Sequence, residues 1–249
     1  MLAIIGGSGL SKIREKSPLN EERVTTPFGS EAIAVDYYQF GSQQLAFLAR
    51  HGPNGAIPPH RVNYRANIWA LHELGHRRVL GINVVGGIHP EMAPGAIMVP
   101  DQLIDYTQGR PGTFYEEGLE RAVHIDFTEP FDPCLRAQLL EQLERLNAGH
   151  QERRTVLDRG VYGCTQGPRL ETAAEIRRLQ RDGCDIVGMT AMPEAALARE
   201  LGMAYALLTL SVNWAAGLDA GEISMEAIGQ MITEGMEFVL PLLEDWQED

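Results

Sequence analysis

Short apolar runs and amphipathic segments alternate along most of the chain. Apolar runs of strand length occupy residues 2–5, 33–40, 44–49, 79–85, 156–162, 185–187 and 203–212, and the second and third predict a hairpin turned at Gly41-Ser42. Helical spacing occupies residues 62–74, 135–146, 172–181, the segment that Pro193 opens, and 224–243, with Ser224 as the expected N-cap. This alternation predicts an α/β fold with a central mixed sheet surrounded by helices. Because neither a repeat nor a linker divides the chain, residues 1–249 are expected to form a single domain.

Composition narrows the class of partner. The net charge of −13 disfavours nucleic acid and anionic membrane surfaces, because both are polyanions. The three cysteines are widely spaced and form no C-x-x-C pair, which indicates a reduced, cytoplasmic chain. No apolar run approaches the roughly 18 residues of a membrane span. A small anionic ligand remains compatible with these features if basic residues are concentrated in one pocket.

The segment from His72 to His76 reads H-E-L-G-H and matches the H-E-x-x-H pattern of zinc proteases. That chemistry needs both histidines on one face of a helix, together with a third ligand. Gly75 stands inside the motif, where the helix is expected to end, so the two rings are expected to diverge. A polar helix end is therefore favoured over a metal site.

Several polar side chains follow predicted strands, where ligands gather in α/β sheets. The turn Gly6-Gly7-Ser8-Gly9 offers backbone N–H groups and a hydroxyl to an anion, although it can equally be a tight bend. Arg50-His51 suits phosphate, since arginine binds it bidentately. Glu171 precedes a helix, where an acid is also favoured by the helix dipole. Asn213 ends an apolar run, so a buried amide there must either tie a loop or bind a ligand.

Seven motifs lie along the chain in a fixed order. They are I-G-G-S-G-L at 5–10, T-P-F-G at 26–29, A-R-H-G at 49–52, V-N-Y-R-A-N-I-W-A-L at 62–71, the stretch 101–106 with Phe114-Tyr115, G-P-R-L-E-T at 167–172, and G-M-T-A-M-P-E-A at 188–195. Together they cover nearly the whole chain. The set resembles the trimeric purine nucleoside phosphorylase family, and most closely its methylthioadenosine phosphorylase branch.

The resemblance implies both a reaction and an assembly. The family cleaves the glycosidic bond of purine nucleosides with inorganic phosphate as co-substrate, giving the free base and a ribose 1-phosphate without a metal or an organic cofactor. It implies a central mixed sheet that partly closes into a barrel, and a homotrimer with active sites near the subunit interfaces. We therefore expect an enzyme of purine salvage.

The resemblance also assigns roles to individual residues. The positions that hold phosphate are matched by Ser8, Arg50, His51 and Thr190, and Asn83 falls near another such position. Met189 matches the residue beneath the ribose, and Asn213 and Glu171 fall where the purine is recognised. His124 matches a residue that reaches into the neighbouring subunit's pocket. Leu170 stands where the family usually stacks an aromatic residue on the base.

The residues expected to read the base depart from the methylthioadenosine branch. That branch has aspartate at the positions of Asn213 and Ala215 and serine at that of Glu171. The asparagine, alanine and glutamate of this chain instead resemble the inosine/guanosine-cleaving branch. A 6-oxopurine presents an acceptor at O6 and a donor at N1, which suits an amide NH₂ and a carboxylate. Adenine presents the reverse pattern. The base site therefore favours a 6-oxopurine.

The other end of the expected substrate points to the methylthio branch. The inosine/guanosine branch places a late histidine at the ribose 5′-hydroxyl, but this chain has no histidine after His150. Residues 222–228 instead resemble the apolar stretch that receives a methylthio group, with Ile223, Met225 and Ile228 as candidate lining residues. A 6-oxopurine combined with a 5′-methylthio group indicates 5′-methylthioinosine.

Four alternatives stay open from the sequence. Within the family they are a methylthioadenosine phosphorylase and a general inosine/guanosine phosphorylase. Outside it they are a zinc hydrolase built on His72 and His76, and a nucleoside-binding protein without catalytic activity. The last is disfavoured because a silent binder has little need for a phosphate site.

Overall fold

Eleven strands form one mixed sheet in the part of the chain that the computed structural model describes, which comprises residues 1–10, 13, 17–219, 221, 223–244 and 246. The strands are β1 (Leu2–Gly6), β2 (Asn20–Val24), β3 (Ile33–Phe40), β4 (Gln43–Ala49), β5 (Arg78–Gly87), β6 (Ile97–Met98), β7 (Gln102–Asp105), β8 (Val156–Leu157), β9 (Val161–Cys164), β10 (Ile186–Gly188) and β11 (Ala204–Trp214). The helices are α2 (Tyr64–Glu73), α3 (Pro133–Gly149), α4 (Ala173–Arg181), α5 (Ala191–Glu200) and α6 (Met225–Glu244), with short 3₁₀ turns η1 (Ser8–Leu10) and η2 (Pro59–Arg61).

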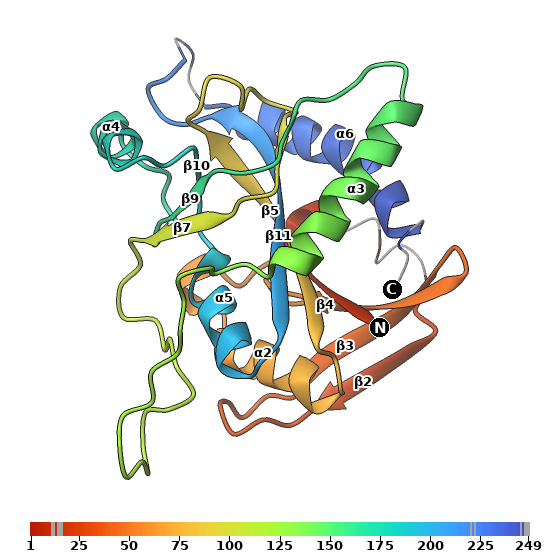
Figure 1. Cartoon of the computed structure of the whole chain (residues 1–249), viewed down its shortest axis with the longest axis vertical. Coiled ribbons are helices and arrows are strands. Elements are labelled where there is room, and N and C mark those ends of the chain that lie inside the picture. The colour runs from red at the N-terminus through yellow and green to blue at the C-terminus, as the bar shows by residue number, and fades with distance from the viewer. Residues whose placement is uncertain (11–12, 14–16, 220, 222, 245, 247–249) are drawn as a thin grey trace.

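Helices cover both faces of the central strands. Side chains alternate between the faces of a strand, so Ala3 and Ile5 of β1 pack in one core cluster with Ile68 of α2, while Leu2 and Ile4 pack in another with helices α3 and α6. In Figure 1, α2 and α5 lie together at one side of the long strands β5 and β11, and α3 and α6 lie at another. The predicted α/β class with a central mixed sheet is confirmed. Of the helices that the structure describes, none is both long and apolar enough to cross a membrane.

The two edges of β5 organise the sheet. β11 pairs in parallel with β5 from Arg78 to Gly87 and so occupies one edge along its whole length. The other edge is shared: β1 pairs in parallel with residues 78–82, and β10 pairs antiparallel with residues 86–87. Between these two partners, no strand in the described part of the chain pairs with residues 83–85 on that edge. The sheet therefore parts here, which agrees with the expectation of a partly closed sheet.

Most element predictions are confirmed, and the differences have local causes. The strand predicted at 156–162 is two strands, β8 and β9, because the chain turns at Gly160, whose φ of 151° is rare for other residues. β2 was missed because its sequence, N-E-E-R-V, is polar and mostly exposed and pairs only with β3. Ser224 caps α6 as predicted, with its Oγ accepting from the Ala227 N–H at 3.2 Å.

Candidate active site

Two parallel strands, β1 and β4, end beside the middle of β5. Gly6 of β1 is in register with Ala49 of β4 and with Ile82 of β5. Gly7 and Arg50 therefore lie just beyond the ends of β1 and β4, beside Asn83 in the middle of β5. Because β1 and β4 run parallel, Gly7 and Arg50 occupy carboxyl-end positions, where ligands bind in open α/β sheets, while β5 continues past them.

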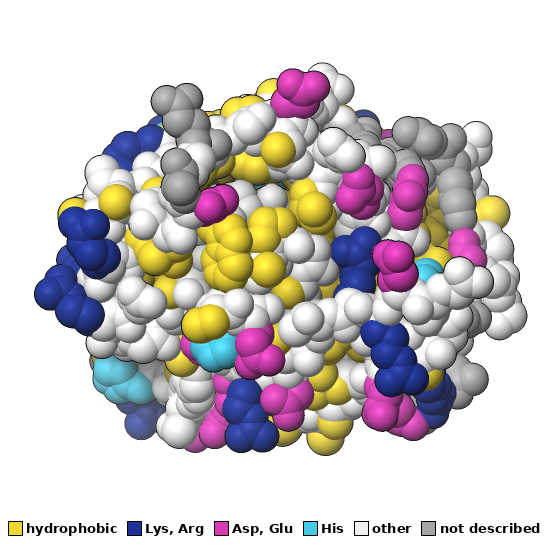
Figure 2. Space-filling view, turned by 90° about the horizontal axis from the view of Figure 1, so that it is seen from above, with side chains coloured by type: hydrophobic (Ala, Val, Ile, Leu, Met, Phe, Trp, Pro, Cys, Tyr) yellow, Lys and Arg dark blue, Asp and Glu magenta, His cyan; other side chains and the backbone are white. Residues whose placement is uncertain are grey.

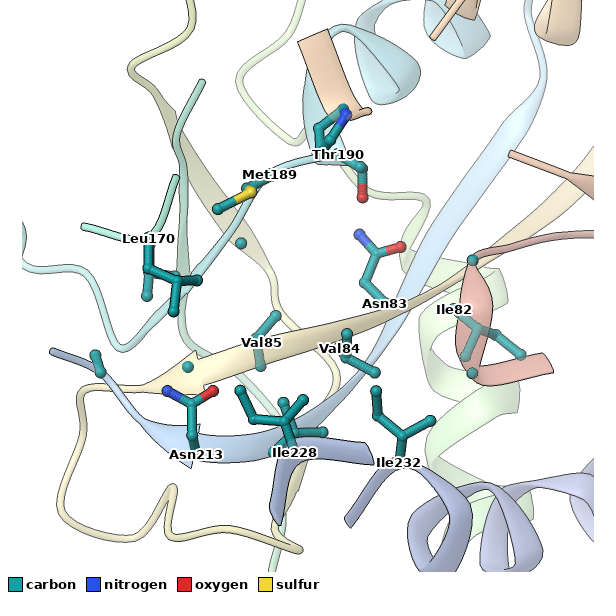
Figure 3. A pocket seen from close by; sticks show the side chains of 18 of the residues that line it. Ile82, Asn83, Val84, Val85, Leu170, Met189, Thr190, Asn213, Ile228 and Ile232 are labelled. Atoms are coloured by element: carbon teal, nitrogen blue, oxygen red, sulfur yellow. The ribbon is translucent and has the colours of Figure 1, made fainter. Parts of the chain in front are cut away.

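β10 reaches the same place from the opposite direction. Its antiparallel register pairs Ile186 with Gly87 and Val187 with Gly86, so the chain beyond β10 runs back along β5 and brings Thr190 toward Asn83. Figure 3 shows Thr190 and Asn83 near each other, with Met189 beside them. At Gly188 a Cβ atom would collide with the Tyr162 hydroxyl, so glycine is required where β10 turns into the site. The parted edge of β5 thus becomes the wall of a pocket.

The pocket has a volume of about 280 Å³ and gathers most of the residues predicted from the sequence. Its lining includes Arg50, His51, Asn83, Leu170, Glu171, Met189, Thr190, Asn213, Ile223, Met225 and Ile228. Gly7 and Gly9, on either side of Ser8, also line it, but the Ser8 side chain lies outside the described part of the structure. His124 is exposed on the segment between β7 and α3 and is not among the lining residues. Seen from above, hydrophobic side chains gather in the middle of the face and charged ones surround them (Figure 2).

Arg50 is held by a carboxylate that the sequence analysis did not single out. Its Nε and Nη2 each donate to one oxygen of Glu194, both at 2.7 Å, and both side chains are almost completely buried. Nη2 also donates to the Ile5 carbonyl at 3.3 Å, and Nη1 to the Ile82 carbonyl at 3.5 Å. Burial opposes the positive charge, but Glu194 outweighs it and keeps the Arg50 pKa above its ordinary value. Since a guanidinium has five N–H donors, one on Nη1 is left for a ligand.

His51 presents a neutral ring to the pocket. Its Nδ1 donates to the Ile57 carbonyl at 2.7 Å, which leaves Nε2 for a ligand. Burial is the main cause that lowers the His51 pKa, and the charge of Arg50 adds to it, while the Ile57 bond and Glu194 act in the opposite direction. The net direction is downward, so the ring is uncharged at neutral pH.

This shift predicts how the stability of the protein depends on pH. Because the folded His51 has a pKa below its ordinary value of 6.5, the unfolded chain binds a proton more readily, and stability should decrease as pH falls through about 6.5. The variant His51→Gln keeps a donor for the Ile57 carbonyl and cannot titrate. Thermal unfolding of both proteins at pH of about 7.5 and 5.5 should show a smaller loss of Tm in the variant. Equal losses would show that His51 is not the titrating group. The control is the variant His76→Gln, because burial also lowers the pKa of His76, which lies outside the pocket.

Asn83 and Thr190 share a buried tyrosine. The Tyr162 hydroxyl accepts from the Thr190 N–H at 3.4 Å and from Asn83 Nδ2 at 3.5 Å, and burial raises its pKa, so it stays protonated. Asn83 Oδ1 is buried without a hydrogen-bond partner among the described residues. An unpaired buried acceptor is costly in a folded protein, so one that lines a pocket points to a ligand.

The opposite side of the pocket holds the residues predicted to read a base. Figure 3 shows Asn213 and Leu170 there, away from Thr190. Asn213 Nδ2 donates one hydrogen to the Trp214 carbonyl at 2.6 Å and has a second one available. Glu171 Oε1 accepts from Thr165 Oγ1 at 2.5 Å, which leaves the other carboxylate oxygen for a ligand. One donor and one acceptor are thus presented together.

Apolar side chains of α6 close the third side. Ile228 lines the pocket, together with Ile223 just before the helix and Met225 at its start, which is 70% exposed. Ile232 and Met236, one and two turns further along α6, also line it and were missed. Their spacing of four residues matches a helix face, but core packing produces the same pattern. Only the position of these side chains at the pocket distinguishes a lining role from plain core packing.

Arg110 is a second residue that the sequence analysis missed. It lies between β7 and α3 and donates to four backbone carbonyls, those of Thr165 and Gln166 after β9 and those of Met189 and Met192 after β10. Its guanidinium also lies over the Tyr64 ring, 5.5 Å from the centroid. Arg110 therefore ties together the two loops that carry Glu171 and Thr190. No sequence signal marked it, because an isolated arginine in a loop is common.

Replacing Arg110 with methionine should both destabilise the protein and lower its activity. The variant leaves four carbonyls without this donor, and charged hydrogen bonds contribute about 1.5–3 kcal/mol each, reduced here because the side chain is partly exposed. We expect a lower Tm and a loss of kcat/KM. The matched control is Arg121→Met on the same segment, where the side chain is exposed. Equal Tm values for the two variants would contradict the role of Arg110.

The H-E-L-G-H segment does not form a shared ligand set. α2 ends at Glu73 and Gly75 has a φ of 85°, so His76 lies beyond the helix, as expected. The His76 ring lies against Tyr37, with Nε2 3.3 Å from the hydroxyl, while His72 stays on the helix beside Glu73. Within the described ranges, no three His, Cys, Asp or Glu side chains are grouped to hold a metal ion.

Comparisons with known proteins agree with this geometry. The chain matches the Phosphorylase superfamily over residues 1–245. It is 50% identical over 239 residues to a probable S-methyl-5′-thioinosine phosphorylase of Pseudomonas syringae, covering 94% of this chain and 93% of the relative. It is 43% identical over 247 residues to a 6-oxopurine nucleoside phosphorylase of Pyrococcus furiosus, covering 97% and 90% of the two chains.

Solved structures show the same fold. Methylthioadenosine phosphorylase from Schistosoma mansoni, in complex with adenine, superimposes with a TM-score of 0.89 at 30% sequence identity. The match covers 98% of this chain and 89% of that one. The same protein in its apo form matches with a TM-score of 0.85.

Proposed function

Because the chain belongs to the phosphorylase superfamily, we propose that it cleaves S-methyl-5′-thioinosine with inorganic phosphate, giving hypoxanthine and 5-methylthioribose 1-phosphate. The observation that carries this proposal is the combination in one pocket of Asn213 and Glu171 at one end with an apolar α6 wall at another. Relatives named for a 6-oxopurine and for methylthioinosine support it. Inorganic phosphate is a co-substrate, and the proposed reaction uses no other cofactor.

The phosphate is placed at the polar end of the pocket. Arg50 offers its remaining N–H, the Gly7–Gly9 turn offers backbone N–H groups, and Thr190 offers a hydroxyl, with Ser8 proposed as a further donor. Asn83 Oδ1 and His51 Nε2 can accept from the hydroxyl of monohydrogen phosphate. Departure of the base leaves positive charge on the sugar, which a phosphate dianion held close by stabilises before it attacks the anomeric carbon. In this arrangement Met189 lies beneath the ribose.

The leaving base is placed between Glu171 and Asn213. The free oxygen of Glu171 accepts from N1–H of a 6-oxopurine, and the second Asn213 N–H donates to the purine as electron density builds up on it. Thr165 and the Trp214 carbonyl fix the two side chains before substrate binds. Leu170 packs against the base in place of an aromatic ring.

The 5′ substituent is placed against α6. Ile223, Met225 and Ile228 line this part of the pocket, with Ile232 and Met236 beyond them. An apolar wall favours a methylthio group over a hydroxyl, because a buried hydroxyl without a partner costs about 1–3 kcal/mol. This contrast distinguishes the proposal from a general inosine/guanosine phosphorylase.

A panel of nucleosides tests the proposal. Phosphate-dependent release of free base is measured for methylthioinosine, methylthioadenosine, inosine, guanosine and adenosine, and compared as kcat/KM. We expect methylthioinosine to exceed each of the others by about tenfold or more. A lead for methylthioadenosine would overturn the base assignment, and equal values for inosine and methylthioinosine would overturn the apolar 5′ site. Binding without turnover would favour the catalytically silent alternative.

We also propose that the enzyme works as a homotrimer in the cytoplasm, with His124 completing a neighbour's pocket. The support is the exposure of His124 on a long segment between β7 and α3, which extends away from the body in Figure 1. Sedimentation should give a mass of about three chains, and His124→Ala should raise the KM for nucleoside without changing that mass. A monomer with full activity would contradict this assembly.

A further inference from the structure

The carboxylate that holds Arg50 is itself held by a third buried side chain. The Tyr205 hydroxyl of β11 donates to Glu194 Oε1 at 2.7 Å, the same oxygen that accepts from Arg50 Nη2. Burial, followed by the negative charge of Glu194, raises the Tyr205 pKa, so the phenol remains a donor at neutral pH. Glu194 thus accepts three hydrogen bonds at complete burial, and it links α5 to β11 and to the residue that follows β4.

This network limits how Arg50 can meet an anion. The two carboxylate bonds lie in the plane of the guanidinium and leave it no freedom to rotate. The Ile5 and Ile82 carbonyls take two further N–H groups. The remaining Nη1–H is therefore fixed in direction, and the charge of Arg50 is already balanced by Glu194.

We infer that Glu194, supported by Tyr205, is a positioning residue that aims the remaining N–H of Arg50 at the phosphate. The inference rests on the proposed function, in which Arg50 holds phosphate. Glu194 and Tyr205 do not line the active-site pocket and are assigned no contact with substrate. An arginine whose charge is balanced acts on the anion mainly through the direction of one hydrogen bond, so small rotations should matter more than charge.

The variant Glu194→Gln separates direction from charge. Glutamine has the same shape, but its NH₂ group faces one of the two Arg50 donors, so that bond is lost and the guanidinium turns. If charge balance alone mattered, removing the negative charge would strengthen phosphate binding. If the direction of the remaining Arg50 N–H matters, phosphate binding weakens. The milder variant Tyr205→Phe removes one bond from Glu194 and keeps the ion pair.

The experiment measures KM for phosphate and for nucleoside, kcat, and the Kd of inorganic phosphate by calorimetry, with Tm for each variant. We expect Glu194→Gln to raise the phosphate KM and Kd by about tenfold or more, and Tyr205→Phe by a smaller factor, with the nucleoside KM nearly unchanged. The matched control is Tyr37→Phe on β3, which removes a buried contact with His76 Nε2, and neither of these residues lines the active-site pocket. It should lower Tm without changing the phosphate KM.

Each outcome separates the hypotheses. A tighter phosphate Kd in Glu194→Gln, or an unchanged phosphate KM in both variants, would overturn the positioning role. A reduced kcat with both KM values unchanged would indicate a structural role only. A wild-type protein that binds phosphate but does not cleave nucleosides would overturn the proposed function, and the calorimetric comparison would still test the positioning of Arg50.

Discussion

Replacing Asn213 with aspartate should reverse much of the preference of the enzyme between 6-oxo and 6-amino purines. We expect the ratio of kcat/KM for methylthioinosine to that for methylthioadenosine to fall by about tenfold to a hundredfold, equivalent to one mismatched buried contact. The N–H that faces the purine is replaced by an acceptor, which repels O6 and can bind the amino group of adenine. The measurement is phosphorolysis of both nucleosides at saturating phosphate.

The Trp214 carbonyl adds a second effect to this variant. In the wild-type protein it accepts from Asn213 Nδ2 at 2.6 Å, and a carboxylate oxygen there would repel it. The aspartate must therefore turn away or retain a proton, so kcat for both substrates should also fall. The control Asn213→Ala removes the donor without adding an acceptor and should lower methylthioinosine use without helping methylthioadenosine. An unchanged ratio in the aspartate variant would remove Asn213 from the base site.

Replacing Arg50 with methionine should cost about 3–5 kcal/mol of unfolding free energy, because it leaves the Glu194 carboxylate buried without its cation. It should also lower kcat/KM for phosphate by about a hundredfold or more, since a charged donor to the anion is lost. Denaturant unfolding measures the first effect, and initial rates at varied phosphate measure the second.

A double variant separates these two losses. Arg50→Met combined with Glu194→Leu removes both charges together, and buried ion pairs replaced by apolar residues are often neutral in stability. We expect the double variant to regain part of the stability that Arg50→Met loses while phosphate use remains lost. The recovery is partial because the buried Tyr205 hydroxyl and the Ile5 and Ile82 carbonyls still lack their partners. Recovery of phosphate use in this folded double variant would show that Arg50 does not hold the anion. Equal stability of Arg50→Met and wild type would contradict the ion pair.

The alternation of apolar runs and helical segments predicted most of the fold, because the central strands are buried on both faces. β1, β5 and β11 are mostly apolar and buried, and such segments carry a strong local signal. The strands that the sequence missed are polar or short, such as β2 and the two-residue β6. Their pairing depends on a neighbouring strand rather than on their own residues.

The candidate site shows the same division. Residues at or just past the ends of apolar strands, such as Asn213 and Arg50, were predicted from the sequence because a polar residue at a strand end stands out from its surroundings. Glu194, Tyr205 and Arg110 were not found, since each acts on a residue distant in sequence. Glu194 lies 144 positions from Arg50, and no local pattern marks such a pair. Conversely, H-E-L-G-H is a strong local pattern whose helix ends before the second histidine.

The sequence by itself determined the α/β class and the family resemblance, and it predicted most of the polar residues that line the pocket, because these depend on residue type and order along the chain. Only the tertiary structure decided where the sheet parts, because β1 and β10 share one edge of β5 from opposite directions. It also decided that Arg50 has one N–H left for a ligand and that α6 closes the apolar side. These properties arise from contacts between segments that are distant in sequence, because the partner of each hydrogen-bond donor is fixed only when those segments pack together.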